Sequence, residues 1–128
     1  QKEHVLGTFV YATNRGFYFA NEGAPCHADV FLHGTDAGSY GIFLNSPEGS
    51  ALNFMASQLV LLGATPNGII AAGNAFAGKA NFYGILAWGA KSGPTAAIDG
   101  TGRVLLQQVH TDNREFRLNS GTVRVENS

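Results

Sequence analysis

The sequence predicts an all-β protein, and three observations lead to that prediction. Apolar runs of strand length recur along the chain, with turn signals about every ten residues. Glycine is abundant, at 17 of 128 residues, and many of the glycines fall between those runs. No segment combines a convincing 3.6-residue apolar period with helix caps, as an amphipathic helix would. We therefore expect one domain of short strands joined by glycine-rich turns.

The expected strands follow one another from the N-terminal to the C-terminal part of the chain. They are residues 9–11, 17–19, 40–44, 59–62, 69–70, 81–88, 103–106, 116–118 and 123–125. The last two alternate apolar and charged residues, which is typical of a half-buried strand. Asn67 and Gly68 suit a tight turn. A short helix over 50–62 is the alternative at one place, because Met55, Ala56 and Leu59 stand near helical spacing.

Charge is distributed unevenly. Only 13% of residues are charged, and the 30 residues 49–78 contain no Asp, Glu, Lys, Arg or His. Polar residues interrupt this segment, so it is not a membrane span. Burial against identical neighbours is the economical explanation. We therefore expect an elongated, intertwined homotrimer, a triple β-helix or β-prism stalk in which each chain gives one short strand to each layer.

The charge pattern also suggests two regions. Residues 1–100 form a β-prism-like or irregular β receptor-binding region. Residues 101–128 are more polar and form a thinner triple β-helix stem with its charges outward. Small residues are expected where three chains crowd the trimer axis, namely Gly73, Ala75, Ala77, Gly78 and Ala80.

The two stretches 98–104 and 118–128 resemble the distal stalk of bacteriophage tailspikes and tail fibres. They are similar in particular to endosialidase-type spikes, which carry an intramolecular chaperone. The resemblance implies a trimeric stalk in the virion tail, outside the cell. It also implies a C-terminal chaperone domain that assembles the trimer and is then released by a cut after Ser128. The opening residues 1–4 do not read as a signal peptide, as expected for the interior of a longer protein.

The residues do not predict catalysis, a metal or a cofactor. Nine acidic residues are present, but none stands in a motif that marks a glycosidase pair. Cys26, His27 and His33 match no standard zinc spacing, and the pair Cys26 and His110 lacks the surroundings of a nucleophile. The single cysteine excludes an intrachain disulfide and is expected to be a small buried side chain. A net charge of −1 argues against nucleic acid as a partner.

Binding of a saccharide is the function that the residue types favour. A sugar site needs an aromatic face for the ring, polar groups for the hydroxyls, and a cation where the sugar is acidic. Two clusters offer these groups. They are Tyr11, Asn14, Arg15 and Tyr18 in one, and Tyr83, Trp88, Lys91 and Ser92 in the other. The structural alternative for both clusters is aromatic rings with packed bodies and solvated polar tips.

The predicted function is therefore the trimerising stalk of a phage tailspike. It would bind host surface polysaccharide, with sialic acid as an example of an acidic sugar, and would have no chemistry of its own. Two alternatives stay open. The chain is a fragment of a phage polysaccharide-degrading enzyme, or it is a monomeric, secreted β-sandwich module that binds carbohydrate.

Overall fold

The structure is a computed structural model that describes residues 2–64, 68–112 and 115–128, without the side chains of 63, 64 and 90–92. The described residues form strands and turns and no helix, which confirms the all-β prediction. The strands are β1 (Glu3–Leu6), β2 (Phe9–Tyr11), β3 (Arg15–Phe19), β4 (His27–Phe31), β5 (Gly34–Asp36), β6 (Tyr40–Leu44), β7 (Ala51–Met55), β8 (Gln58–Ala64), β9 (Ile70–Ala72), β10 (Lys79–Ser92), β11 (Ala96–Ile98), β12 (Arg103–Thr111), β13 (Phe116–Leu118) and β14 (Thr122–Glu126).

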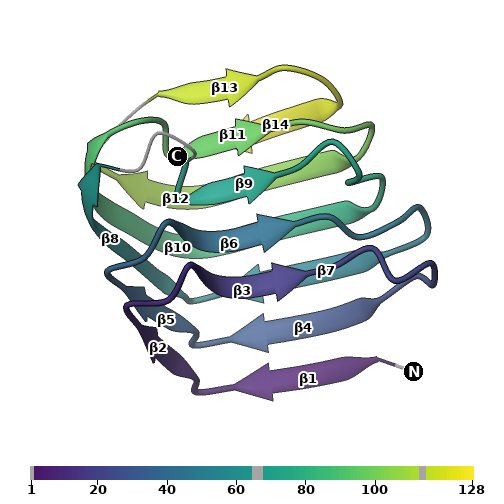
Figure 1. Ribbon diagram of the computed structural model, residues 1–128, viewed down its shortest axis with the longest axis horizontal. Coiled ribbons are helices and arrows are strands. Elements are labelled where there is room, and N and C mark those ends of the chain that lie inside the picture. Colours follow the sequence, from purple (N-terminus) through teal and green to yellow (C-terminus); the bar gives the residue numbers. More distant parts are fainter. Residues whose placement is uncertain (1, 65–67, 113–114) are drawn as a thin grey trace.

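These strands wind into a parallel β-solenoid, in which successive turns of one chain stack as layers with three faces (Figure 1). Face A contains β1, β4, β7, the first halves of β10 and β12, and β14. Face B contains β2, β5, β8 and the second halves of β10 and β12. Face C contains β3, β6, β9, β11 and β13. The pairing is parallel throughout, so each face presents straight columns of side chains from successive layers.

The corner between faces A and B is made by one left-handed residue in each layer. The stacked residues are Gly7, Leu32, Ala56, Gly84, Gln108 and Asn127, with φ between 50° and 65°. Only two of the six are glycine, and the left-handed conformation strains the others. Hydrogen bonds between layers hold the corner, for example from Leu32 N to Met55 O and from Ala56 N to Tyr83 O.

The core runs through the middle of the coil, because the inward side chains of all three faces meet there. Phe54 on face A is fully buried and stacks on Phe82 of the next layer, with ring centroids 4.7 Å apart. Phe17 and Phe19 of face C meet the edge of Phe54 at 6.2 and 5.7 Å. Burial of apolar surface in this column is the main stabilising contribution of the fold.

The strand predictions are largely confirmed, and the helix alternative is wrong. Strands β2, β6 and β13 have the bounds predicted for 9–11, 40–44 and 116–118. Residues 50–62 form β7 and β8 with a left-handed corner at Ala56, because their apolar side chains alternate into the core. The predicted turn at Asn67 lies outside the described residues.

The charge-free segment 49–78 forms the central layer, and a single chain buries its inward side chains. Leu52, Leu59 and Ile70 are fully buried between the layer before and the layer after. The small residues expected at a trimer axis also pack within this chain: Ala80 lies in the core, and Gly78 leaves no room for a side chain beside Ser50. The solenoid therefore shares only its general shape with a triple β-helix, because one chain closes each layer by itself.

The two predicted regions, 1–100 and 101–128, belong to the same solenoid. β10 and β12 lie on opposite sides of that boundary and pair in parallel from Lys79 with Arg103 to Ala87 with Thr111. The later strands β13 and β14 continue faces C and A. The stem therefore continues the coil of the preceding residues.

One buried histidine follows the corner between faces A and B. His33 is 1% exposed, its Nδ1 lies 2.7 Å from the Thr8 hydroxyl, and its ring meets Phe17 edge-on at 4.9 Å. Its Nε2 is buried and has no hydrogen-bond partner among the described residues. Burial lowers the pKa of His33 from its ordinary value of 6.5, since a charged ring would lose its hydration.

This burial makes the fold sensitive to acid. Below pH 6.5 His33 binds a proton in the unfolded chain but stays neutral in the folded chain. Protonation therefore favours the unfolded state, and we expect the free energy of unfolding to fall as pH falls from 6.5 toward the lowered pKa. The slope from this group stays below about 1.4 kcal/mol per pH unit. Urea midpoints at pH 7.5 and 5.5 measure the loss, and a His33→Phe variant should lose less. An equal loss in that variant would assign the acid sensitivity to other groups.

Candidate functional site

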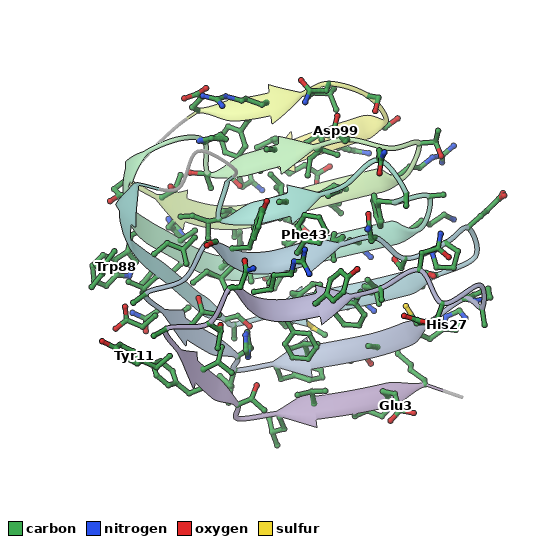
Figure 2. The ribbon with its side chains drawn as sticks, viewed as in Figure 1. Glu3, Tyr11, His27, Phe43, Trp88 and Asp99 are labelled. Atoms are coloured by element: carbon green, nitrogen blue, oxygen red, sulfur yellow. The ribbon has the colours of Figure 1, made fainter. Side chains whose placement is uncertain are left out.

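The solenoid distributes the predicted binding residues over three faces. Tyr11 lies on β2 and Trp88 on β10, both on face B, and Figure 2 shows both side chains projecting from the same side of the molecule. Tyr83 lies on β10 before the corner and so belongs to face A. Arg15 and Tyr18 lie on β3 of face C, and exposed Asn14 precedes that strand. The side chains of Lys91 and Ser92 lie outside those that the structure describes.

One outward column of face B carries two exposed aromatic side chains, Tyr11 and Trp88, with Asp36 and the buried Val60 between them. Tyr11 pairs with Asp36, the next layer contributes Val60, and Val60 pairs with Trp88. Tyr11 and Trp88 therefore stand three layers apart, roughly 14 Å along the solenoid. Tyr11 is 67% exposed and Trp88 is 37% exposed.

Apolar side chains extend this column on the same face. Phe9 and Leu86 occupy the neighbouring outward column and are exposed, and Leu62 is exposed near Trp88. The described outward side chains of β2, β5, β8 and β10 on this face include no Lys or Arg. Exposed apolar and aromatic side chains gathered on one face make that face a candidate interaction site.

Two carboxylates accompany the aromatic column. Asp36 lies between Tyr11 and Val60, and its Oδ1 is buried without a partner among the described residues. Asp112 follows Thr111, the partner of Ala87, and accepts a hydrogen bond from Gly89 N at 3.0 Å. The two acids are therefore three layers apart, roughly 14 Å, whereas the carboxylates of glycosidases are separated by about 5–9.5 Å.

Face C holds an arginine among aromatic rings. The guanidinium of Arg15 lies 4.5 Å from the ring centroid of Tyr18 and 4.8 Å from that of Phe43. Tyr40 meets Phe43 edge-on at 4.8 Å. The pairing of β3 with β6 brings these groups together, so Phe43 and Tyr40 join the predicted pair Arg15 and Tyr18. The rings hold the cation on the outer face, where a cation–π contact contributes about 0.5–1 kcal/mol.

A polar ladder crosses the outside of face A. The amide of Asn81 donates to Asn53 at 2.9 Å, and Asn53 donates to Asp29 at 2.8 Å. Lys2 forms a salt bridge with Asp29 at 2.8 Å, and His4 lies 3.4 Å from the same carboxylate. The Lys2 hydrogen bond, followed by that from Asn53, lowers the pKa of Asp29. The ladder ties four layers together and keeps this carboxylate ionised.

The same face carries a cationic group, of which Arg103 and Arg124 fall within the stem predicted for 101–128 and Lys79 does not. Lys79 and Arg103 are exposed and directly opposite each other on β10 and β12. A groove of about 450 Å³ contains both, together with Arg124. A second groove, of about 550 Å³, lies between Glu48 and the same two cations. A sequence signal for the pair Lys79 and Arg103 was present, since each directly follows a glycine, Gly78 and Gly102.

Cys26, His27, His33 and His110 do not come together as a metal site or a nucleophile pair. His27 lies at the outer side of face A, where Figure 2 shows it, whereas His33 is buried after the next corner. Cys26 is half-buried, 3.7 Å from the Ser50 hydroxyl, and His110 is exposed beyond the corner on β12. Within 2–64, 68–112 and 115–128, no three His, Cys, Asp or Glu side chains gather as a metal site.

Ser128, the predicted processing residue, lies at the corner between faces A and B. Its hydroxyl accepts a hydrogen bond from Val109 N at 2.9 Å and donates one to Glu126 O at 3.1 Å. Ser57 occupies the equivalent position in the central layer and accepts from His33 N at 3.2 Å. Ser128 and Ser57 thus make the same pair of hydrogen bonds at this corner, one accepted from a backbone N of the preceding layer and one donated to a carbonyl two residues earlier.

The described residues contain no helix that is long and apolar enough to cross a membrane. Set against protein-family models, curated proteins and solved structures, the chain matches none.

Proposed function

We propose that this chain is a non-catalytic binding module that holds a surface polysaccharide along face B. The observation that carries the proposal is the outward column in which Tyr11 and Trp88 stand three layers apart, both exposed. Aromatic rings of this kind pack against the apolar side of a sugar ring, while their polar tips stay solvated. A straight column suits a linear polysaccharide, because Tyr11 and Trp88 can contact different sugar rings of the same polymer.

Binding fits face B better than hydrolysis. Asp36 and Asp112 are too far apart to share the acid and nucleophile, or acid and base, positions around one glycosidic bond. The alternative of an enzyme fragment is tested by release of reducing ends from the same polymers. The other alternative is a monomeric binding module. Its predicted β-sandwich fold is wrong, because the chain forms a solenoid.

We place the module in the stalk of a phage tailspike, as a homotrimer on the outside of the virion. Exposed leucines at the edges of face B, Leu6, Leu32 and Leu62, support contact with further copies. Three copies on one rigid stalk would bind a polymer with avidity far above that of one site. In this proposal a C-terminal chaperone assembles the trimer and is released by a cut after Ser128.

A polysaccharide titration tests the proposed function. Trp88 is the only tryptophan, so its fluorescence reports on face B directly. We expect neutral and acidic capsular polymers to include at least one that shifts this emission. Tyr11→Ala and Trp88→Ala should each weaken binding about fivefold to tenfold, measured by calorimetry, since an aromatic contact contributes about 0.5–1.5 kcal/mol.

Phe116→Ala is the matched control, because Phe116 is an exposed aromatic residue on face C that belongs to neither predicted cluster. It should leave polymer affinity unchanged. Light scattering on the same samples gives the solution mass, which for the trimer is three times 13.5 kDa. Unchanged Trp88 emission with every polymer would contradict the polysaccharide site, and a mass near one chain would contradict the trimer.

A further inference from the structure

Face A presents a regular grid of outward side chains on its last three layers. β10 contributes Lys79 and Asn81, β12 contributes Arg103 opposite Lys79, and β14 contributes Thr122 opposite Arg103. Arg124 lies on the same strand as Thr122, two residues further on, so it also faces outward and is exposed. Neighbouring members of one column are separated by the strand spacing, about 4.8 Å.

A groove runs over this grid. It has a volume of about 450 Å³, and its charged lining residues are Lys79, Arg103 and Arg124, with no acidic side chain among them. Asn81 and Thr122 add hydrogen-bonding groups to the same lining. The grid therefore combines three cations with neutral polar groups in one depression, which is the composition expected for recognition of an anion.

The cations of the groove are arranged at an electrostatic cost. Lys79 and Arg103 are directly opposite on neighbouring strands, and like charges in that position destabilise a sheet. Neither forms a salt bridge with any side chain in the described part of the chain. Arg124 is held by Glu126, with Nε and Oε1 2.5 Å apart. An anion between Lys79 and Arg103 would relieve their repulsion and would satisfy both groups.

The surroundings limit the kind of anion. Glu48 lines the neighbouring groove beside Lys79 and Arg103, and Glu126 lies next to Arg124. These acids would repel a densely charged polymer such as DNA, which carries a phosphate at every nucleotide. They leave room for single anionic groups spaced along an otherwise neutral chain. A carboxylate matches the donor geometry of a guanidinium, and amide and hydroxyl groups beside it match sugar hydroxyls.

We propose that the groove formed by Lys79, Asn81, Arg103, Thr122 and Arg124 binds the carboxylate of an acidic saccharide. The site is separate from the aromatic column on face B, and it rests on the proposed function only in taking a saccharide as its ligand. Lys79 and Arg103 hold the carboxylate between them, and Asn81 and Thr122 bind hydroxyl groups of the same residue. Tyr83, 47% exposed and two positions beyond Asn81 on β10, offers its ring to the next sugar.

The test compares carboxylated polymers with their carboxyl-reduced forms. Hyaluronan, polysialic acid and polygalacturonate are titrated by calorimetry at 50 and 200 mM salt. We expect at least one to bind, and its carboxyl-reduced form to bind at least tenfold more weakly. The double variant Lys79→Gln and Arg103→Gln should bind the carboxylated polymer at least tenfold more weakly than the unaltered protein does, and its affinity for the carboxyl-reduced polymer should not change. Its binding should also depend less on salt concentration.

Arg117→Gln is the matched control, because it removes an exposed cation from face C and should leave affinity unchanged. Trp88→Ala separates the two sites: it tests face B, so loss in that variant alone supports the proposed function and overturns the carboxylate site. Equal binding of the carboxylated and reduced polymers, or no binding by any of the three, also overturns it. Binding of duplex DNA that depends equally on Lys79 and Arg103 would overturn the saccharide as ligand.

Discussion

Replacement of Phe54 by alanine is expected to destabilise the solenoid by about 3–5 kcal/mol, as is usual for loss of a fully buried phenylalanine. Phe54 is 0% exposed, stacks on Phe82 with an interplanar angle of 4°, and receives the rings of Phe17 and Phe19 edge-on. Its removal would open a cavity between faces A and C that flat sheets cannot close. Urea denaturation followed by circular dichroism and by Trp88 fluorescence measures the effect.

Tyr11→Ala is the control for this substitution. Tyr11 is 67% exposed, so the change should alter the free energy of unfolding by no more than about 0.5 kcal/mol. The same measurement shows that the variant used for polysaccharide binding keeps its fold. If Phe54→Ala cost no more than Tyr11→Ala, the stacked aromatic core described above would be wrong.

Replacement of Gly100 by alanine is expected to have a comparable or larger effect. Gly100 has a φ of +83°, and a Cβ there would overlap the carbonyl oxygen of Phe76 and lie 2.9 Å from that of Gly73. The Phe76 carbonyl accepts hydrogen bonds from Thr101 N at 2.9 Å and Gly102 N at 3.1 Å. The methyl group would force this corner between faces C and A apart and break both bonds.

Gly23→Ala separates the steric overlap from backbone strain. Gly23 has the same φ of +83°, but a Cβ there would meet nothing within 4 Å. We expect Gly23→Ala to cost about 1–2 kcal/mol, the price of the left-handed conformation for alanine. The difference between the two midpoints in urea isolates the close approach of the backbone at Gly100. Equal losses would show that strain at φ alone explains both.

Rigidity of the coil is what positions both candidate surfaces. The aromatic column on face B and the cationic grid on face A are each made by strands far apart in the chain, and neither exists within one layer. Strand β10 belongs to both, since its first half carries Lys79 and Asn81 and its second half carries Trp88. The bend at Gly84, with a φ of +63°, turns these two halves onto different faces. A polymer long enough to pass around this corner would contact both surfaces.

Strand content could be predicted from the sequence because it depends on local pattern. Residues 40–44 and 116–118 are short apolar or alternating runs bounded by turn residues, and both form strands with the predicted bounds. The same reasoning identified 59–62 and 81–88, which are parts of β8 and β10. Alternation and turn residues act within a few positions, so one sequence is enough to recognise them.

The coil could not be predicted in the same way, for two reasons. The corners of the coil between faces A and B use residues without a turn signature, such as Leu32 and Ala56, whose left-handed conformation is held by bonds to the next layer. The offset between paired layers also varies, from 19 residues for Arg103 with Thr122 to 28 for Ala51 with Lys79. A repeat of unequal length leaves no fixed period to detect. Without that period, the charge-free middle suggests a trimer interface, whereas its inward side chains lie in the core of one chain.

For the candidate sites, the sequence by itself determined which kinds of side chain were present: Trp88 and Tyr11 as aromatic groups, and cations with amides as partners for an acidic sugar. Whether the aromatic rings are exposed was decided by the structure. Only the tertiary structure decided which of them share a surface. It separated Tyr11 from Arg15 and Tyr18, joined Tyr11 to Trp88, and joined Lys79 to Arg103 and Arg124. The physical reason is that neighbours in a parallel solenoid are set by register between layers some 24 residues apart, and nothing in the local chain encodes that register.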